Sequence, residues 1–124
     1  MLGCMASRRS TGPDLWVRLL VQGRFGNRCA RCGRDGASVQ HRKPRQSGGT
    51  RDPAINYPSN LLWVCGDGVR GCHGHMESYR TEAYANGWLV HRGHEPTERP
   101  VSLWDGRRVL LDDEGGWSHA AEEG

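Results

Sequence analysis

Apolar residues near the start of the chain recur at the spacing of one helical face: Leu15, Trp16, Leu19 and Leu20. Pro13 is suited to the first turn of such a helix, and Gly23 is available to end it. The pattern predicts one short amphipathic helix, with Trp16 in the core of the protein. Residues 24–36, which follow it, form a predicted loop with repeated glycines around two cysteines.

Two short runs of apolar and β-branched residues predict strands. The first is ASVQH at 37–41, and the second is LLWV at 61–64, which leads directly into Cys65. Residues 43–60 between them are rich in Pro, Gly, Ser and Asn and have no periodicity, so they predict a long loop. Long loops within compact domains are usually functional or flexible.

The rest of the chain predicts one helix followed by short strands. The helix covers 76–86 and is closed by Asn86 and Gly87. The segments GWLVHRG, PVSLW and RRVLLDD are expected to be strands, with Asp105 and Gly106 as a two-residue hairpin turn. Trp63 and Trp88 are expected in the core, and the last ten residues are expected to be frayed.

The composition indicates that apolar burial alone does not hold this fold together. A chain of 124 residues has room for one domain, only 35% of its residues are hydrophobic, and 18 are glycine. Metal ligation or disulfides are therefore expected to contribute. No apolar run reaches the ~20 residues of a membrane span, and no secretory signal is evident. We expect a cytoplasmic protein without a membrane partner, whose five cysteines are thiols or metal ligands.

Charge is distributed unevenly between the two halves of the chain. Residues 1–58 carry eleven Arg and Lys against three Asp and Glu, whereas residues 59–124 carry six against eleven. Nearly all of the cations are arginine, whose planar fork suits bidentate contact with phosphate. The same charge could equally be a solvated surface, because charge alone identifies no partner.

Four cysteines occur as two pairs that are typical of a zinc site. They are Cys29 and Cys32, with two residues between them, and Cys65 and Cys72, with six residues between them. Four thiolates complete a tetrahedral Zn²⁺ shell with no open position, so this zinc is expected to be structural. Cys4 stands alone in the sequence and is expected to have no role. Chemistry must then come from the polar residues that the two pairs bring together: Gln40, His41, Asn60 and His73.

These residues resemble the HNH endonuclease family. The resemblance rests on a Cys-x2-Cys knuckle, a strand ending in His41, Asn60 five residues before Cys65, and the pair Cys72-His73. The longer stretch QHRKPRQSGGTRDPAINYPSNLLWVCGDGVRGCHGHMESYR is similar to HNH proteins carried by actinobacterial phages. The family implies a small α+β fold, a ββα-metal (HNH or treble-clef-like) core with a four-cysteine zinc, here flanked by an N-terminal helix and C-terminal strands.

The resemblance also implies a role for each site residue. His41 would be the general base that activates water, since a neutral imidazole accepts a proton near pH 7. Asn60 would orient His41 and brace the loop, and His73 would coordinate one catalytic divalent ion, Mg²⁺, Mn²⁺, Ni²⁺ or Zn²⁺.

Two further ligand positions follow from the family pattern. Gln40 stands where the family commonly has Asp or His, and its neutral amide is a weaker ligand. Glu77 lies one helical turn after His73, with His75 as an alternative.

The family pattern suggests a division into three parts: a disordered basic arm at 1–12, an HNH nuclease domain at 13–95, and a β-hairpin extension with a polar tail at 96–124. DNA is the expected partner, with contacts at Arg42, Lys43, Arg45 and Arg51. Phage proteins of this kind suggest the terminase large subunit as a second partner. His91, His94 and His119 are expected to be ordinary surface or core residues. The alternatives to a nuclease are a zinc module that only binds nucleic acid and a zinc adaptor that docks on a larger enzyme.

Overall fold

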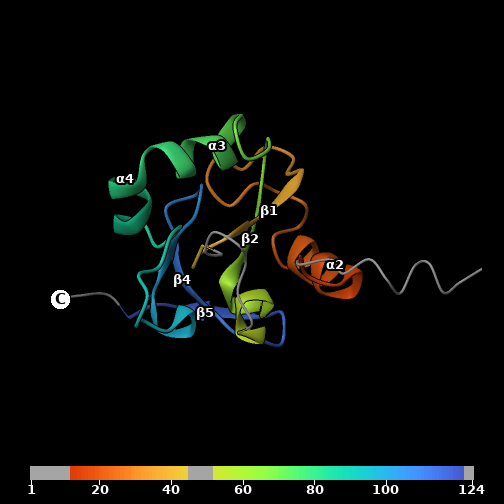
Figure 1. Ribbon diagram of the computed structural model, residues 1–124, viewed down its shortest axis with the longest axis vertical. Helices are drawn as coiled ribbons and strands as arrows, with labels where there is room; N and C mark the ends of the chain where they lie inside the picture. Colours follow the sequence, from red (N-terminus) through yellow and green to blue (C-terminus); the bar gives the residue numbers. More distant parts are fainter. Residues whose placement is uncertain (1–11, 45–51, 122–124) are drawn as a thin grey trace, which may run out of the picture.

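The protein is a small α+β structure with short helices and two antiparallel sheets. A computed structural model describes residues 12–44 and 52–121. Figure 1 shows the helices α3 (Gly71–Ser78) and α4 (Arg80–Ala85) along one side of the molecule, the strands β1 (Ser38–His41) and β2 (Leu61–Val64) in its middle, and the C-terminal strands on the side opposite α3. Residues 1–11, which include Cys4 and most of the expected basic arm, lie outside the described residues.

The central sheet has two strands, β1 (Ser38–His41) and β2 (Leu61–Val64). They pair antiparallel, with Val39 opposite Trp63 and His41 opposite Leu61. Every residue of β2 is buried, because sheet and helices cover both of its faces. Both strands were expected from the apolar runs, and their existence is confirmed.

The first helix, α2 (Leu15–Arg24), forms where the pattern predicts it but buries a different face. Val17 and Val21 face the core, whereas Leu15 and Trp16 are 71% and 65% exposed. The expectation that Trp16 belongs to the core is therefore wrong. Val17 and Val21 stand four residues apart, so they define an apolar stripe of their own, and it is this narrower stripe that packs on β2.

The predicted helix at 76–86 is two helices, α3 (Gly71–Ser78) and α4 (Arg80–Ala85), separated at Tyr79. The helical region starts five residues earlier than predicted, because GCHGH has no amphipathic pattern that could announce a helix. Cys72 and Met76, one turn apart and buried, hold α3 against the sheet. The chain leaves α4 through Asn86 and Gly87, as expected, with Gly87 at a φ of +73°.

The second sheet has three strands, β3 (Val101–Ser102), β4 (Arg108–Leu111) and β5 (Trp117–His119). A turn at Asp105 and Gly106 does join β3 to β4, but it is not the expected two-residue turn: Ser102 pairs with Arg108 and the Leu103 amide donates to the Arg107 carbonyl, so three residues, 104–106, form the connection. The segment GWLVHRG is not a strand, since the amides of Trp88 and Leu89 both donate to the Ala83 carbonyl at the end of α4. The expected frayed tail instead contains β5.

One hydrophobic cluster connects both sheets and the helices. Val21, Leu61 and Met76 from the first part of the fold belong to the same buried cluster as Val101 and Leu111. The C-terminal strands therefore share a core with the elements that carry the cysteines. Short 3-10 turns, η1 (Pro53–Asn56), η2 (Pro58–Asn60) and η3 (Pro96–Glu98), complete the described structure. No helix in the described part of the chain could cross a membrane.

Candidate metal centre and adjoining site

The four cysteines predicted to bind zinc lie together in space. Their Sγ atoms all lie within 4.8 Å of one another. Cys29 and Cys32 come from the loop after α2, Cys65 follows β2, and Cys72 lies in the first turn of α3. Between residues 12 and 44 and between 52 and 121, this is the one group of three or more His, Cys, Asp or Glu side chains with ligand atoms so close.

Glycine makes the second cysteine pair possible. Gly66 has a φ of +82°, and a Cβ at this position would lie 2.0 Å from the carbonyl oxygen of Arg70. The chain can therefore turn back on itself between Cys65 and Cys72 only where no side chain intervenes. The backbone amide of Cys72 then lies 3.4 Å from the Sγ of Cys65, as the close packing of a thiolate cluster requires.

The chemistry of the four thiols fits a divalent metal ion. Burial raises the pKa of the Cys72 thiol to about 12, and the charge of Cys29 acts in the same direction, while a hydrogen bond from Arg31 opposes it. Four sulfur atoms in this space cannot all be thiolates unless a cation balances them, and Zn²⁺ displaces the thiol protons when it binds. Arg31 contributes a further positive charge, with its Nη1 3.3 Å from the Cys72 sulfur.

A second group of polar side chains lies between β1 and α3. Residues two apart on a strand share a face, so Ser38 and Gln40 both point toward α3. Ser38 meets His73, with 2.8 Å between Oγ and Nδ1, and Gln40 meets Glu77, with 3.1 Å between Nε2 and Oε1. His73 and Glu77 are themselves one helical turn apart. The fold thus brings together Gln40, His73 and Glu77, three of the residues predicted to bind a catalytic ion.

The hydrogen bonds of Ser38 determine which nitrogen of His73 carries the proton. The Ser38 hydroxyl donates its only proton to the carbonyl of Gly66, 2.8 Å away. Its oxygen must therefore accept from Nδ1–H of His73, which leaves the imidazole lone pair on Nε2. Burial lowers the pKa of His73, while Glu77 and Asp67 act to raise it. A neutral imidazole with its other nitrogen held by a hydrogen bond is the usual state of a metal-binding histidine.

Gln40 has one buried polar atom without a partner. Its amide donates to the His41 carbonyl at 3.0 Å and to Glu77, while its Oε1 is buried and accepts no hydrogen bond. An unsatisfied buried acceptor lowers the stability of the folded state by about 1–3 kcal/mol. A hydrogen-bond donor or a cation beside Oε1 of Gln40 would remove this cost. His75, the alternative ligand, instead contacts Glu82, with 2.5 Å between Nε2 and Oε2.

His41 lies at the end of β1 and makes contacts away from α3. Its Nε2 is 2.8 Å from Oδ1 of Asn56, a residue of η1 that sequence reasoning did not select. An amide oxygen can only accept, so this contact places a ring proton on Nε2. Asn60, which is fully buried, receives the Lys43 amide at 2.8 Å and donates to the Ile55 carbonyl at 2.9 Å. Asn60 therefore braces the loop, and Asn56 holds the ring of His41.

Arg42, predicted to contact DNA, is 0% exposed. Its guanidinium donates to the backbone carbonyls of four residues, Gly87, Ser59, Pro96 and Arg99, at 2.6 to 2.9 Å. Burial lowers its pKa to about 9, and the charge of Arg24 adds to this effect. No phosphate can reach the side chain, so the prediction for Arg42 is corrected: its role is to join separate segments of the fold.

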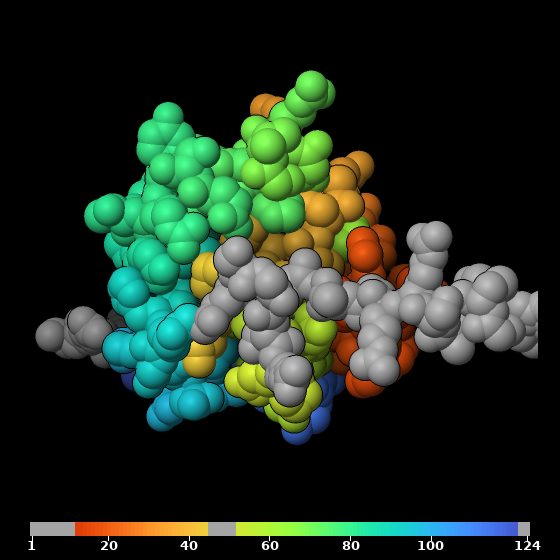
Figure 2. All heavy atoms as spheres, viewed as in Figure 1, coloured from red at the N-terminus to blue at the C-terminus, as the bar shows by residue number. Residues whose placement is uncertain are grey.

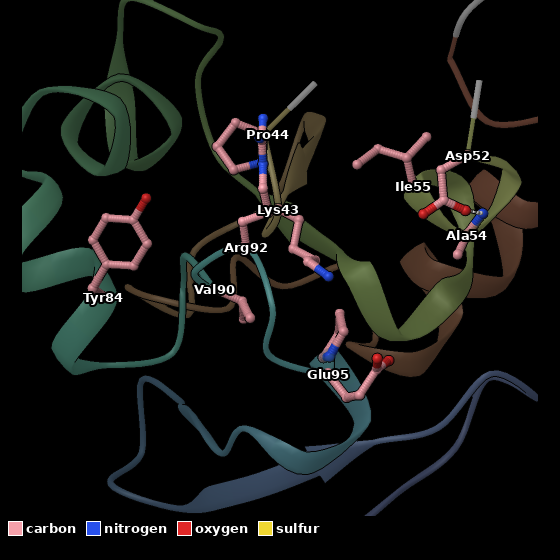
Figure 3. Close-up of a pocket in the computed structure, with 10 residues that line it drawn as sticks. Lys43, Pro44, Asp52, Ala54, Ile55, Tyr84, Val90, Arg92 and Glu95 are labelled. Atoms are coloured by element: carbon pink, nitrogen blue, oxygen red, sulfur yellow. Dashed lines mark hydrogen bonds between the residues drawn. The ribbon is translucent and has the colours of Figure 1, made fainter. Parts of the chain in front are cut away.

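Lys43 lines a cleft of about 550 Å³ beside this end of β1. Figure 3 shows Tyr84 of α4 on one side of the cleft, Asp52 and Ile55 on the other, and Lys43 between them. Arg92 and Glu95 come from the segment after Val90. The position of Lys43 leaves it able to meet an anionic ligand, whereas Arg45 and Arg51 lie outside the described residues.

Sequence reasoning missed Ser38, Asn56 and the role of Arg42. The alternation along β1 could have identified Ser38, because it stands two residues before Gln40 on the same face. No local signal could have identified Asn56 or Arg42, since their partners lie 15 or more positions away. Comparisons of the chain with protein-family models, curated proteins and solved structures find no match.

Proposed function

We propose that this protein is a metal-dependent endonuclease of the HNH, ββα-metal type that hydrolyses DNA. The observation that carries the proposal is the pair of contacts between β1 and α3, Ser38 with His73 and Gln40 with Glu77. These contacts belong to two antiparallel strands followed by a helix, beside a four-cysteine cluster that accounts for structural zinc separately. The two strands and the helix would then carry the catalytic residues, and the zinc would hold these elements together.

The catalytic ion would be held by Nε2 of His73, Oε1 of Gln40 and the carboxylate of Glu77. The first has its lone pair directed by Ser38, and the second is the buried acceptor without a partner. A bound divalent ion stabilises negative charge on the scissile phosphate and on the leaving 3′-oxygen. Two of the three donors are neutral, which favours a weakly held, exchangeable ion such as Mg²⁺, Mn²⁺ or Ni²⁺, although Zn²⁺ fits the donor types as well.

His41 is the proposed general base. A neutral imidazole would accept a proton from the attacking water, and the contact of Nε2 with Asn56 would hold the ring in position. Alternation along β1 places its side chain on the face opposite Gln40. In an in-line displacement, the water attacks phosphorus from the side opposite the leaving 3′-oxygen. A general base on one face of β1 and a metal ion on the other face, both at the end of the strand, suit this reaction. Asn60 would support the base by joining the backbone at Lys43 to the backbone at Ile55.

A plasmid-nicking assay of His41→Ala tests the proposal. Loss of a general base lowers the rate of nicking by about 10² to 10⁴-fold in Mg²⁺, Mn²⁺ or Ni²⁺. Zinc content, measured by mass spectrometry, and the melting temperature are expected to be unchanged. His119→Ala, at an exposed position in β5, is the matched control and is expected to cut at the wild-type rate.

The proposal fails if purified His41→Ala nicks DNA as fast as the wild type and contaminating nuclease has been excluded. If the wild type binds DNA but does not nick it with any of these ions, the protein is a zinc module that only binds nucleic acid. The neutral Gln40 ligand is the feature that favours this second function.

A further inference from the structure

We propose that a second, smaller cleft, formed by His91, His94, Arg99 and Arg108, binds one backbone phosphate of duplex DNA. This inference rests on the proposed function, since it concerns the same substrate. The cleft has a volume of about 170 Å³ and lies between the end of α4, the segment after Leu89 and strand β4. None of these four residues was selected as a DNA contact from the sequence.

The charge of the cleft points to an anion. Two arginines and two histidines line it, and no Asp or Glu does. Elsewhere in the described residues, Arg31, Arg80 and Arg107 are paired with carboxylates, but Arg99 and Arg108 form no ion pair. A guanidinium that lines a cleft and has no carboxylate partner keeps its N–H groups available to donate to phosphate oxygens.

The walls of the cleft are held in position before any ligand binds. The ring of His91 stacks on Tyr84, with centroids 3.8 Å apart and planes 4° from parallel, and the amide of His94 donates to the His91 carbonyl. On the other side, buried Arg42 holds the carbonyls of Gly87 and Arg99. A preformed site avoids the entropy cost of ordering side chains on binding.

The size and surroundings of the cleft favour a phosphate that belongs to a polymer. Its volume is below the range of roughly 300–1,000 Å³ that is typical of small-molecule sites. It also shares Tyr84 and Val90 with the larger cleft, which is lined by Lys43 and Arg92 and also by Asp52 and Glu95. The smaller cleft, which has no carboxylate, is therefore the better place for a phosphate. Figure 2 shows the segment around residues 90–100, in cyan, next to α3 and α4 on one continuous face of the molecule.

Fluorescence polarisation with a labelled DNA duplex tests the proposal, in a zinc-loaded His41→Ala background without added divalent ion. Arg99→Gln together with Arg108→Gln is expected to weaken binding by about tenfold at low salt. It should also reduce the slope of log affinity against log salt by about one, because one phosphate contact is lost. Both side chains are exposed, so the melting temperature is expected to stay at the value of the parent protein.

The control is Arg18→Gln together with Arg34→Gln, which removes the same charge at exposed positions that line neither cleft. It is expected to weaken binding by less than about twofold. Equal losses in both double variants would mean that only diffuse charge matters, and no loss in either would mean that DNA does not use the cleft; each result overturns the proposal.

The cleft could bind either a DNA phosphate or a free phosphate ion. Binding measured in inorganic phosphate and in chloride at equal ionic strength distinguishes these two ligands. If free phosphate binds the cleft and the arginine substitutions leave DNA affinity unchanged, the site serves a small anion and the proposal is wrong. Because binding is measured without cleavage, the result is independent of the nuclease activity. A protein that never nicks DNA could still lose affinity when the cleft is changed, so the two proposals fail separately.

Discussion

At the scale of single residues, the protonation of His73 depends on Ser38, a residue outside the proposed set of metal ligands. Ser38 has one proton, and the Gly66 carbonyl receives it. The serine oxygen is then an acceptor, and it fixes both the tautomer of His73 and the direction of its ring. Residues that orient a metal ligand in this way commonly change metal affinity by about 10- to 100-fold when they are replaced.

Ser38→Ala is therefore expected to raise the Mn²⁺ concentration for half-maximal nicking by about 10- to 100-fold. The measurement is a metal titration of plasmid nicking, with zinc content recorded in parallel because Ser38 also contacts the turn after Cys65. Ser118→Ala, an equivalent change at an exposed position in β5, is the control. An unchanged Mn²⁺ requirement, with zinc retained, would contradict this account of His73.

The contrast between neighbouring residues at the end of β1 shows which roles can be predicted from the sequence. Gln40, His41 and Arg42 are consecutive, and the first two were predicted to lie at the site because of their spacing from the cysteines. Arg42 was assigned to DNA because an arginine beside a site usually contacts solvent or phosphate. Its burial depends on carbonyls more than 15 positions away along the chain, and no local pattern contains that information.

At the scale of elements, α2 illustrates how an apolar pattern can predict a helix and yet mistake its buried face. The chain has apolar residues almost all around this helix, so several faces are compatible with burial. Packing on β2 selects Val17 and Val21, which leaves Leu15, Trp16 and Leu19 exposed. The existence of the helix follows from local sequence, whereas its rotation follows from tertiary contact.

Two substitutions in α2 measure this rotation. Val21→Ala removes two methyl groups from a fully buried position and is expected to lower the free energy of unfolding by about 2 kcal/mol. Leu19→Ala, at a side chain 56% exposed, is expected to change it by less than about 0.5 kcal/mol. Urea unfolding followed by tryptophan fluorescence provides both values, and a larger loss for Leu19→Ala would show that the helix is rotated differently.

The same limit explains the errors in α3 and β5. The start of α3 is unpatterned, yet Cys72 anchors it to the other cysteines, and metal ligation can hold a helix that propensity alone does not support. The strand β5 is short and exposed, and it forms because β4 offers an edge to pair with. Strand β2 was predictable because the short apolar run LLWV stands between polar residues and a cysteine, and β1 because its short run precedes a long loop without periodicity.

At the scale of the whole molecule, the thiol cluster connects segments that lie far apart in the sequence. Cys29 and Cys32 belong to the first loop, and Cys65 and Cys72 join the sheet to α3. We expect one Zn²⁺ per chain. Its removal by a strong chelator is expected to abolish the near-ultraviolet circular dichroism of buried Trp63 and Trp88, because binding energy at such sites is folding energy.

Restoring Zn²⁺ should restore the spectrum. Cys4→Ala is the control for this experiment, since Cys4 is expected to have no role in ligation, and it should retain one ion per chain. A metal-free protein with an unchanged near-ultraviolet spectrum would show that the apolar core suffices and that the cluster has another purpose.

The buried guanidinium of Arg42 has a consequence for the products of the proposed reaction. It adjoins His41 in sequence and at the same time holds the carbonyl of Arg99, which belongs to the arginine and histidine cleft. Arg42 therefore holds the proposed general base, His41, at a fixed distance from the proposed phosphate-binding cleft. Such an enzyme would cleave DNA at a constant number of phosphates from the phosphate that is bound in the cleft.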